Sequence, residues 1–205
     1  MTATPEGEYS PTVTPDGSHI SVIRVESDGT QRLWMLTTEG KDPKVILADV
    51  KPVGYHAWLN ENTVVLFVLG QPATLQVADV TTGKAEIVAR NIGQSIQRMA
   101  DGGVSFVEQS GEGELRTLTI SECRIENGKT VTRALTPAVK GARQAWTAWT
   151  PSGMLLMPHE GTLYGWKAGQ SGWQAVADLA SLGLRNVTRL AVSPKGDRIA
   201  LVAAQ

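Results

Sequence analysis

The tetrapeptide Thr14-Pro15-Asp16-Gly17 is the clearest indication of the fold, because it recurs along the chain at the same place in a longer pattern. Thr150-Pro151-Ser152-Gly153 and Ser193-Pro194-Lys195-Gly196 repeat it, and Asn60-Glu61-Asn62 and Ala100-Asp101-Gly102 are degenerate copies. The complete copies combine a proline, which fixes φ, with a glycine, which accepts a positive φ. Each copy therefore predicts a tight turn between two strands.

Each turn lies within a unit of about 45 residues, a period typical of repeat architectures. In the first copy, the alternation of apolar and polar residues across His19–Val25 predicts a strand. Asp28-Gly29 then predicts a hairpin turn, and residues 31–36 and 44–47 read as two further strands. In the third copy, residues 115–120 read as a strand and Asn127-Gly128 as a turn. Four strand-like runs per copy, repeated at this period, predict an all-β protein with the β-propeller fold.

The repeats predict a single propeller domain over residues 1–205, built from four-stranded antiparallel blades. About four and a half blades are present, which predicts either a partial ring or a five-bladed ring. Their approximate limits are 8–50, 51–90, 91–137, 138–180 and 186–205, the last copy being incomplete. This copy has two strands only, so an exposed blade edge is expected, and such an edge favours a homodimer. Residues 179–184 read as a single helical turn.

Composition argues against two classes of partner. The 19 lysines and arginines balance 20 aspartates and glutamates, so no basic field is expected to hold nucleic acid or an anionic membrane surface. No apolar run reaches the roughly 20 residues that span a bilayer, so membrane insertion is not expected either.

The sequence offers no recognisable reaction centre. Its three histidines and one cysteine do not stand at metal-ligand spacings, and no Gly-x-Ser-x-Gly elbow or phosphate-binding glycine loop occurs. Glu108, Glu112 and Glu114 gather at one hairpin, where they read as a solvated turn and not as a pair of catalytic acids. We therefore predict no catalytic residue, no metal and no cofactor.

Candidate binding residues follow from propeller geometry, because residues at the start of each innermost strand border the central channel, and this channel face usually binds the ligand or partner. Tyr55 and Trp146 offer aromatic faces, His56 an imidazole and Arg189 a guanidinium, which suit peptide or sugar groups. The alternative for Tyr55 and Trp146 is packing between blades, and for His56 a structural role. The predicted binding set is Tyr9, Ser10, Tyr55, His56, Ser95, Trp146 and Arg189.

Four of the six tryptophans form two pairs at equivalent positions of the repeat. Trp34 corresponds to Trp166, and Trp58 corresponds to Trp149. Because recurrence at one repeat position indicates a structural requirement, these four side chains are predicted to pack between blades.

Residues 8–17, EYSPTVTPDG, resemble the Pro-Asp-Gly repeat of TolB-like β-propellers, also called WD-like repeats. Residues 52–58, 66–70, 75–79 and 188–194 extend the resemblance to one group of exported bacterial TolB-like proteins without an assigned function. The resemblance implies a periplasmic or otherwise extracytoplasmic location and a ring of about six blades. Members of the group usually begin with a signal peptide and a further repeat, so this chain is expected to lack an N-terminal part, through truncation or a misplaced start codon.

These observations predict a non-enzymatic binding or scaffolding module, with a protein or peptide partner docked on the channel face. Two alternatives stay open. One is the propeller domain of a prolyl-oligopeptidase-like serine peptidase, separated from its catalytic domain. The other is a propeller that binds a carbohydrate or another small ligand.

Overall fold

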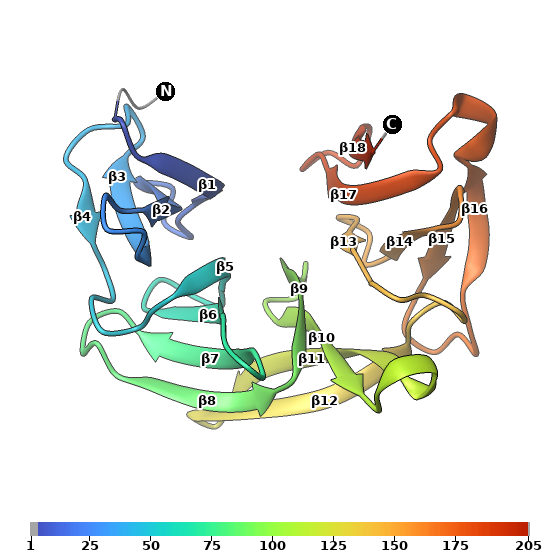
Figure 1. Cartoon of the computed structure of the whole chain (residues 1–205), viewed down its shortest axis with the longest axis horizontal. Helices are drawn as coiled ribbons and strands as arrows, with labels where there is room; N and C mark the ends of the chain where they lie inside the picture. The colour runs from blue at the N-terminus through green and yellow to red at the C-terminus, as the bar shows by residue number, and fades with distance from the viewer. Residues whose placement is uncertain (1–3, 205) are drawn as a thin grey trace. The chain divides into compact units, whose positions relative to one another are not determined.

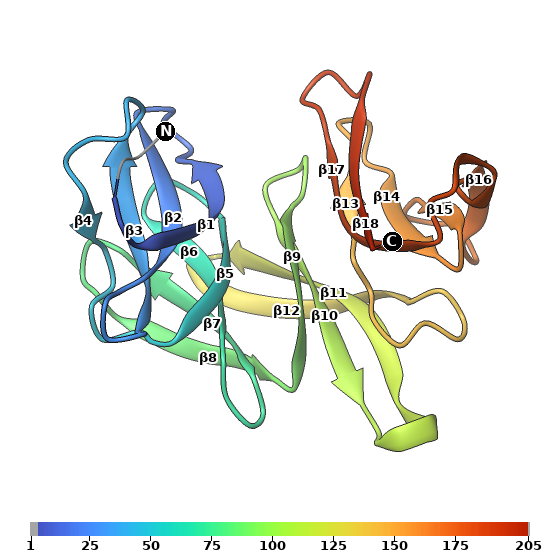
Figure 2. The same ribbon diagram turned by 45° about the horizontal axis from the view of Figure 1, so that its top comes forward.

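The computed structural model describes residues 4–204, which form strands and two short 3-10 turns. These residues contain four four-stranded sheets and one two-stranded sheet. Within each sheet the strands are arranged in chain order, so that successive strands lie side by side (Figures 1 and 2). This meander is the topology of a propeller blade, and the predicted all-β propeller fold with about four and a half blades is confirmed.

The first three strands of each of the first two sheets are six or seven residues long, whereas the fourth strand differs between them. The first sheet contains β1 (Gly7–Val13), β2 (His19–Val25), β3 (Gln31–Thr37) and β4 (Lys44–Val45). The second contains β5 (Val53–Trp58), β6 (Thr63–Val68), β7 (Thr74–Asp79) and β8 (Ala85–Arg90).

The later sheets differ more in the lengths of their strands. The third sheet contains β9 (Ile92–Arg98), β10 (Val104–Ser110), β11 (Thr117–Glu126) and β12 (Lys129–Pro137). The fourth contains β13 (Ala148–Trp149), β14 (Leu155–His159), β15 (Thr162–Trp166) and β16 (Gln174–Asp178). The fifth contains β17 (Asn186–Val192) and β18 (Ile199–Ala204).

The chain divides into two compact units. The first comprises the residues up to Gln94 together with Arg124–Val131, and the second comprises Ser95–Cys123 together with the residues from Thr132 onward. The first and second sheets belong to the first unit, and the fourth and fifth sheets belong to the second. That all 205 residues form a single domain stays a prediction.

The three complete turn motifs share one hydrogen-bonding pattern. The amide of each glycine donates to the carbonyl oxygen of the first motif residue, at 2.8 Å for Gly17, 3.0 Å for Gly153 and 2.8 Å for Gly196. All three glycines have a positive φ, between 72° and 75°, which a residue with a Cβ adopts at a cost. The hydroxyl of the first motif residue also accepts a hydrogen bond from a backbone amide at or directly before the start of the next strand, which explains why this residue is serine or threonine.

The aspartate of the first motif stabilises its turn through hydrogen bonds to neighbouring residues of the turn. The carboxylate of Asp16 accepts hydrogen bonds from the hydroxyl groups of Ser18 and Thr14 and from the Ser18 amide. These hydrogen bonds lower the pKa of Asp16 to about 2, so that the turn keeps its charged acceptor over the ordinary range of pH.

The predicted strands match the structure closely except in two places. The strand predicted over residues 44–47 is limited to Lys44–Val45, and the third sheet differs as well. Residues 115–120 were expected to form a strand, but Gly113–Leu115 is a 3-10 turn and the strand runs from Thr117 to Glu126. The reason is that Gly111 and Gly113 take positive φ values of 72° and 57°, which interrupt an extended backbone. The turn predicted at Asn127-Gly128 is confirmed, with φ of 51° and 74°, as a type I′ hairpin requires.

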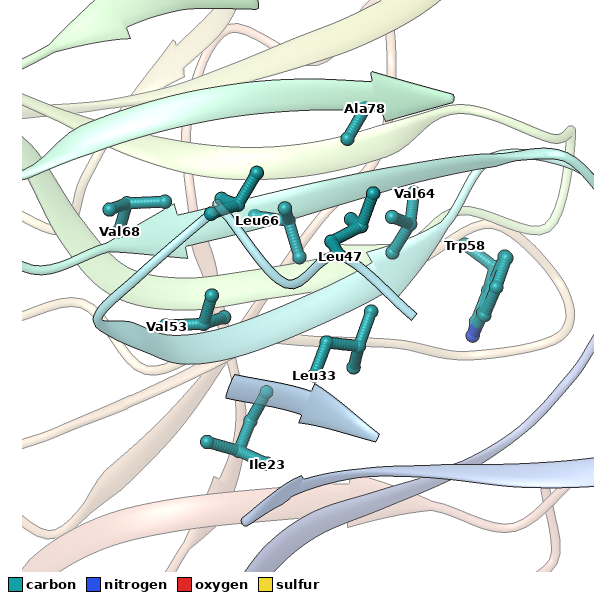
Figure 3. Packing of buried hydrophobic residues seen from close by; sticks show 10 residues of the cluster. Ile23, Leu33, Leu47, Val53, Trp58, Val64, Leu66, Val68 and Ala78 are labelled. Carbon is teal, nitrogen blue, oxygen red and sulfur yellow. The ribbon is translucent and has the colours of Figure 1, made fainter. Parts of the chain in front are cut away.

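The core of the first unit lies between its two sheets. Figure 3 shows Ile23 and Leu33 from the first sheet packed against Val53, Trp58 and residues of β6 in the second. Leu33, Val53, Val64 and Leu66 are fully buried, and each such side chain stabilises the fold by about 1.5–3 kcal/mol. Trp58 therefore packs between blades, as predicted.

The core of the second unit has two clusters. One joins Val107, Leu118 and Ile120 of the third sheet to Leu155, Met157 and Trp166 of the fourth. The other joins Ala148, Leu156 and Leu163 of the fourth sheet to Leu190 of the fifth. Trp166 packs between blades as predicted, whereas its equivalent Trp34 is half-buried beneath the guanidinium of Arg24, 4.4 Å from the ring centroid.

Candidate functional site

The predicted binding residues divide between the two units. Tyr9, Ser10, Tyr55 and His56 belong to the first unit, and Ser95, Trp146 and Arg189 to the second. Within the second unit, Trp146 and Arg189 are in direct contact. The seven side chains differ widely in burial. Some are exposed to solvent and others are buried within their unit.

Tyr9 and Ser10 lie at an irregularity of the innermost strand β1. The pairing of β1 with β2 shifts register between Tyr9 and Thr12, and Ser10 there has a φ of +55°. Similar shifts interrupt β5 between Val53 and Tyr55 and β17 between Val187 and Arg189. Such bulges change the direction in which nearby side chains point. Tyr9 is 58 % exposed, so its phenol is open to a partner.

Tyr55 is half-buried and packs within its own sheet. Its ring meets Phe67 of β6 edge to face, with 5.9 Å between the ring centroids and 69° between the planes. Such an edge contact stabilises an aromatic pair beyond simple burial. The aromatic face of Tyr55 therefore contributes to packing in the first unit.

His56 is buried and belongs to a hydrogen-bonded cluster. Its Nε2 lies 2.7 Å from the hydroxyl oxygen of Ser21, which also accepts a hydrogen bond of 2.9 Å from the indole nitrogen of Trp58. The Ser21 hydroxyl lies 3.1 Å from the carbonyl oxygen of Thr12, to which it donates. Nδ1 of His56 has no hydrogen-bond partner among residues 4–204.

Burial lowers the pKa of His56 from its ordinary value of 6.5 to about 4. The imidazole is therefore neutral at neutral pH, and its protonation works against the folded state. A serine hydroxyl 2.7 Å from an imidazole also has the distance of a nucleophile and its base. In a catalytic triad, however, a carboxylate orients the imidazole through Nδ1, and Ser21 is fully buried with its hydroxyl already bonded to Trp58 and Thr12. The geometry is that of a structural hydrogen-bond cluster.

Ser95 is also buried and holds the segment before β13. Its hydroxyl accepts a hydrogen bond of 3.1 Å from the Thr147 amide and lies 3.1 Å from the Thr147 hydroxyl. Ser95 is 3 % exposed and Thr147 is 2 % exposed, so neither side chain reaches solvent. Ser95 and His56 are therefore both too deeply buried to contact a partner directly.

Trp146 and Arg189 form a stacked pair. The guanidinium carbon of Arg189 lies 3.6 Å from the centroid of the Trp146 ring, the geometry of a close cation–π contact. The Nη1 atom of Arg189 donates a hydrogen bond of 2.6 Å to the carbonyl oxygen of Thr188, which holds the side chain over the ring. Arg189 is exposed and Trp146 is half-buried, so the pair forms a flat, cationic surface that faces solvent.

A pocket of about 350 Å³ opens beside this pair, entirely within the second unit. Three segments form its wall: the loop before β13, the turn between β14 and β15, and the entry to β17. Trp146 lines it together with Arg143 and Arg185, two arginines that were not among the predicted binding residues. Arg185 directly precedes β17 and Arg143 lies shortly before β13, so their position before an innermost strand was the signal available for finding them.

Residues 4–204 contain no group of three or more His, Cys, Asp or Glu side chains placed to hold a metal ion. In the same part of the chain, no helix has the length and apolar character needed to cross a membrane.

Comparison with known proteins assigns the fold. No protein-family model matches the chain, and no match was found among curated proteins. Among solved structures, TolB from Acinetobacter baumannii matches with a TM-score of 0.64 and 17 % identity, over 85 % of this chain and 43 % of TolB. A gluconolactonase from Xanthomonas campestris matches with a TM-score of 0.67 and 7 % identity, over 96 % of this chain and 69 % of that protein.

An acylaminoacyl peptidase from Pyrococcus horikoshii also matches, with a TM-score of 0.61 and 14 % identity, over 97 % of this chain and 35 % of the peptidase. The chain thus spans less than half the length of TolB and of the peptidase. The resemblance to TolB-like propellers is confirmed at the level of the fold. Because the similar structures include proteins of quite different activity, the fold leaves the function open.

Proposed function

We propose that the protein is a non-enzymatic binding or scaffolding module that recognises a protein or peptide partner. The observation that carries this proposal is the stacked pair of Trp146 and Arg189 at the edge of a pocket. Tryptophan and arginine are enriched among the residues that contribute most to binding at protein interfaces, and both supply a large flat surface with polar edges. Here each restrains the other, so less conformational entropy is lost when a partner binds.

The predicted binding residues of the two units differ in how far internal contacts already engage them. Tyr55 and His56 are engaged within the first unit, whereas Arg189 is exposed in the second. We therefore place the principal contact surface on the second unit, and leave Tyr9 and Ser10 as candidates for additional contacts.

The proposal is tested by selecting peptides that bind the full chain from a displayed library of random peptides. Dissociation constants of the selected peptides are then measured for the wild type and for Trp146→Ala, Arg189→Ala and Arg198→Ala. Arg198 is the matched control, because it is an exposed arginine of the same unit that does not line the pocket. We expect a loss of at least tenfold in affinity for the first two variants and no change for the third. Selected peptides that bind Trp146→Ala as tightly as the wild type would contradict the proposal.

We further propose that the protein works outside the cytoplasm, as its resemblance to exported TolB-like proteins implies. Fractionation of cells that express the full-length natural gene tests this point. Recovery of the protein with periplasmic markers is the expected result, and recovery with cytoplasmic markers alone contradicts it.

A further inference from the structure

We infer that the pocket beside Trp146 binds a carboxylate group of the partner, so that the module selects acidic peptides. This inference rests on the proposed function and adds the chemical class of the partner. The volume of the pocket, about 350 Å³, lies at the lower end of the range of ligand pockets. That size suits one or two side chains of a peptide better than a large cofactor.

The two arginines of the pocket have N–H donors that hydrogen bonds within the described residues do not use. Arg185 makes no hydrogen bond or ion pair with any residue of the described segment 4–204, so all five of its N–H donors are available. Arg143 donates from Nη1 to the carbonyl oxygen of Gly113 at 3.3 Å, which anchors one side of its planar guanidinium. A guanidinium held in this way presents its other donors as a fork that matches the two oxygens of a carboxylate.

The charges around the pocket favour an anion. Glu160 is the one carboxylate in its lining, and its side chain is 85 % exposed, so solvent screens its charge strongly. Its Oε1 lies 3.9 Å from Nε2 of His159, and a protonated imidazole there would offset part of its charge. Two guanidinium groups against one screened carboxylate leave the lining positive, and the stacked Arg189 adds a third guanidinium next to it.

The neutral part of the lining suits the remainder of a peptide. Trp146, Pro158 and Val187 provide apolar contact for the carbon atoms of a side chain. Gln144, Asn186 and Thr188 provide amide and hydroxyl groups that hydrogen-bond to peptide backbone. Cationic, apolar and polar lining residues together match an acidic residue within an extended peptide.

Two matched peptide pools test the inference. Both consist of random hexapeptides with acetylated and amidated ends, one with two glutamates in each peptide and the other with glutamines at the same positions. Binding to the full-length chain is measured by calorimetry at low and at moderate ionic strength. The comparison includes the double variant Arg143→Gln/Arg185→Gln and the control Arg198→Gln, with circular dichroism to verify that each is folded.

We expect the wild type and Arg198→Gln to bind the glutamate pool at least tenfold more tightly than the glutamine pool, and salt to reduce the difference. In the folded double variant the preference should disappear while weak binding of both pools remains. Equal binding of both pools by the wild type, lost in Trp146→Ala, would overturn the inference and leave the proposed function standing. Binding of neither pool, together with a display selection that yields no peptide, would overturn both.

Discussion

Two equivalent tetrapeptides, Tyr55-His56-Ala57-Trp58 and Trp146-Thr147-Ala148-Trp149, show how one repeat supports different roles. In both, the last tryptophan donates a hydrogen bond to a buried serine of the preceding sheet, at 2.9 Å to Ser21 and 2.8 Å to Ser105. Each serine hydroxyl in turn donates to a backbone carbonyl oxygen on the first strand of its own sheet. The acceptor is Thr12 for Ser21, at 3.1 Å, and Gln97 for Ser105, at 3.5 Å. This tryptophan–serine bridge is therefore a structural element of the repeat that links neighbouring blades.

The residues before the shared tryptophan distinguish the two tetrapeptides. In the first, Tyr55 packs on Phe67 and His56 adds a buried imidazole to the bridge. In the second, Thr147 bonds to Ser95 instead, and Trp146 lies beneath the exposed Arg189. The first tetrapeptide is thus satisfied by internal contacts and carries a group that titrates, whereas the second presents an aromatic–cation pair beside a pocket. The comparison indicates that repeat position alone does not identify a binding residue.

Removal of the shared tryptophan has the largest expected effect. Trp58→Ala should lower the free energy of unfolding by about 3–5 kcal/mol, because Trp58 is almost fully buried in the core of the first unit. Trp149→Ala should cost less, because Trp149 is only half-buried. Urea titrations followed by circular dichroism measure both values. A larger cost for Trp149→Ala than for Trp58→Ala would contradict the argument from burial.

The pH dependence of stability should differ between the tetrapeptides. His56 titrates near pH 6.5 in the unfolded chain and near 4 in the folded protein, so the unfolded state binds more protons between these values. The stabilisation present above pH 6.5 should be lost as the pH falls toward 4, by about 3 kcal/mol in total.

The variant His56→Thr separates this effect from the titration of carboxylates, because it gives the first tetrapeptide the threonine of the second. Urea titrations at pH 7.5 and pH 4.5 should show a smaller acid-induced loss in the variant than in the wild type. An equal loss in the two proteins would mean that His56 is not the group responsible.

Removal of the serine hydroxyls should have intermediate effects. Ser21→Ala leaves the buried indole N–H of Trp58 without its acceptor and also removes the hydrogen-bond partner of His56 Nε2. The variant should therefore lose about 1–3 kcal/mol in the free energy of unfolding. Ser105→Ala should cost about 1 kcal/mol, because the half-buried Trp149 retains access to water. Thermal and urea unfolding of the two variants test the order, which the opposite ranking would refute.

Arg189→Ala should have the smallest effect on stability. An exposed cation–π contact contributes about 0.5–1 kcal/mol, so the variant should unfold within about 1 kcal/mol of the wild type. A much larger cost in urea titration would indicate that Arg189 belongs to the core of the second unit and not to a contact surface.

The sequence predicted the fold well because the residues of the turn motif determine the geometry of the turn without help from distant residues. Proline, a positive-φ glycine and a leading hydroxyl residue suffice for the turns of Gly17, Gly153 and Gly196, independent of what packs around them. The strand limits failed where glycines change the backbone within a hairpin, as at Gly111 and Gly113.

The candidate site was harder to predict, because burial depends on neighbouring blades. Ser21 reads as the polar member of an alternating strand, yet both faces of β2 are covered and the hydroxyl is fully buried. Only the three-dimensional arrangement shows that His56 shares this hydroxyl with Trp58. Likewise, the loop residue Arg143 and Arg185 before β17 meet in one pocket through the packing of segments far apart in the sequence.

The central claim is that the second tetrapeptide binds the partner and the first is structural. The most direct test measures the affinity of one display-selected peptide for the wild type, Trp146→Ala and His56→Thr under the same conditions. We predict that Trp146→Ala loses at least tenfold in affinity, while folded His56→Thr binds as the wild type does. The opposite pattern, with binding lost in folded His56→Thr and retained in Trp146→Ala, would contradict the claim.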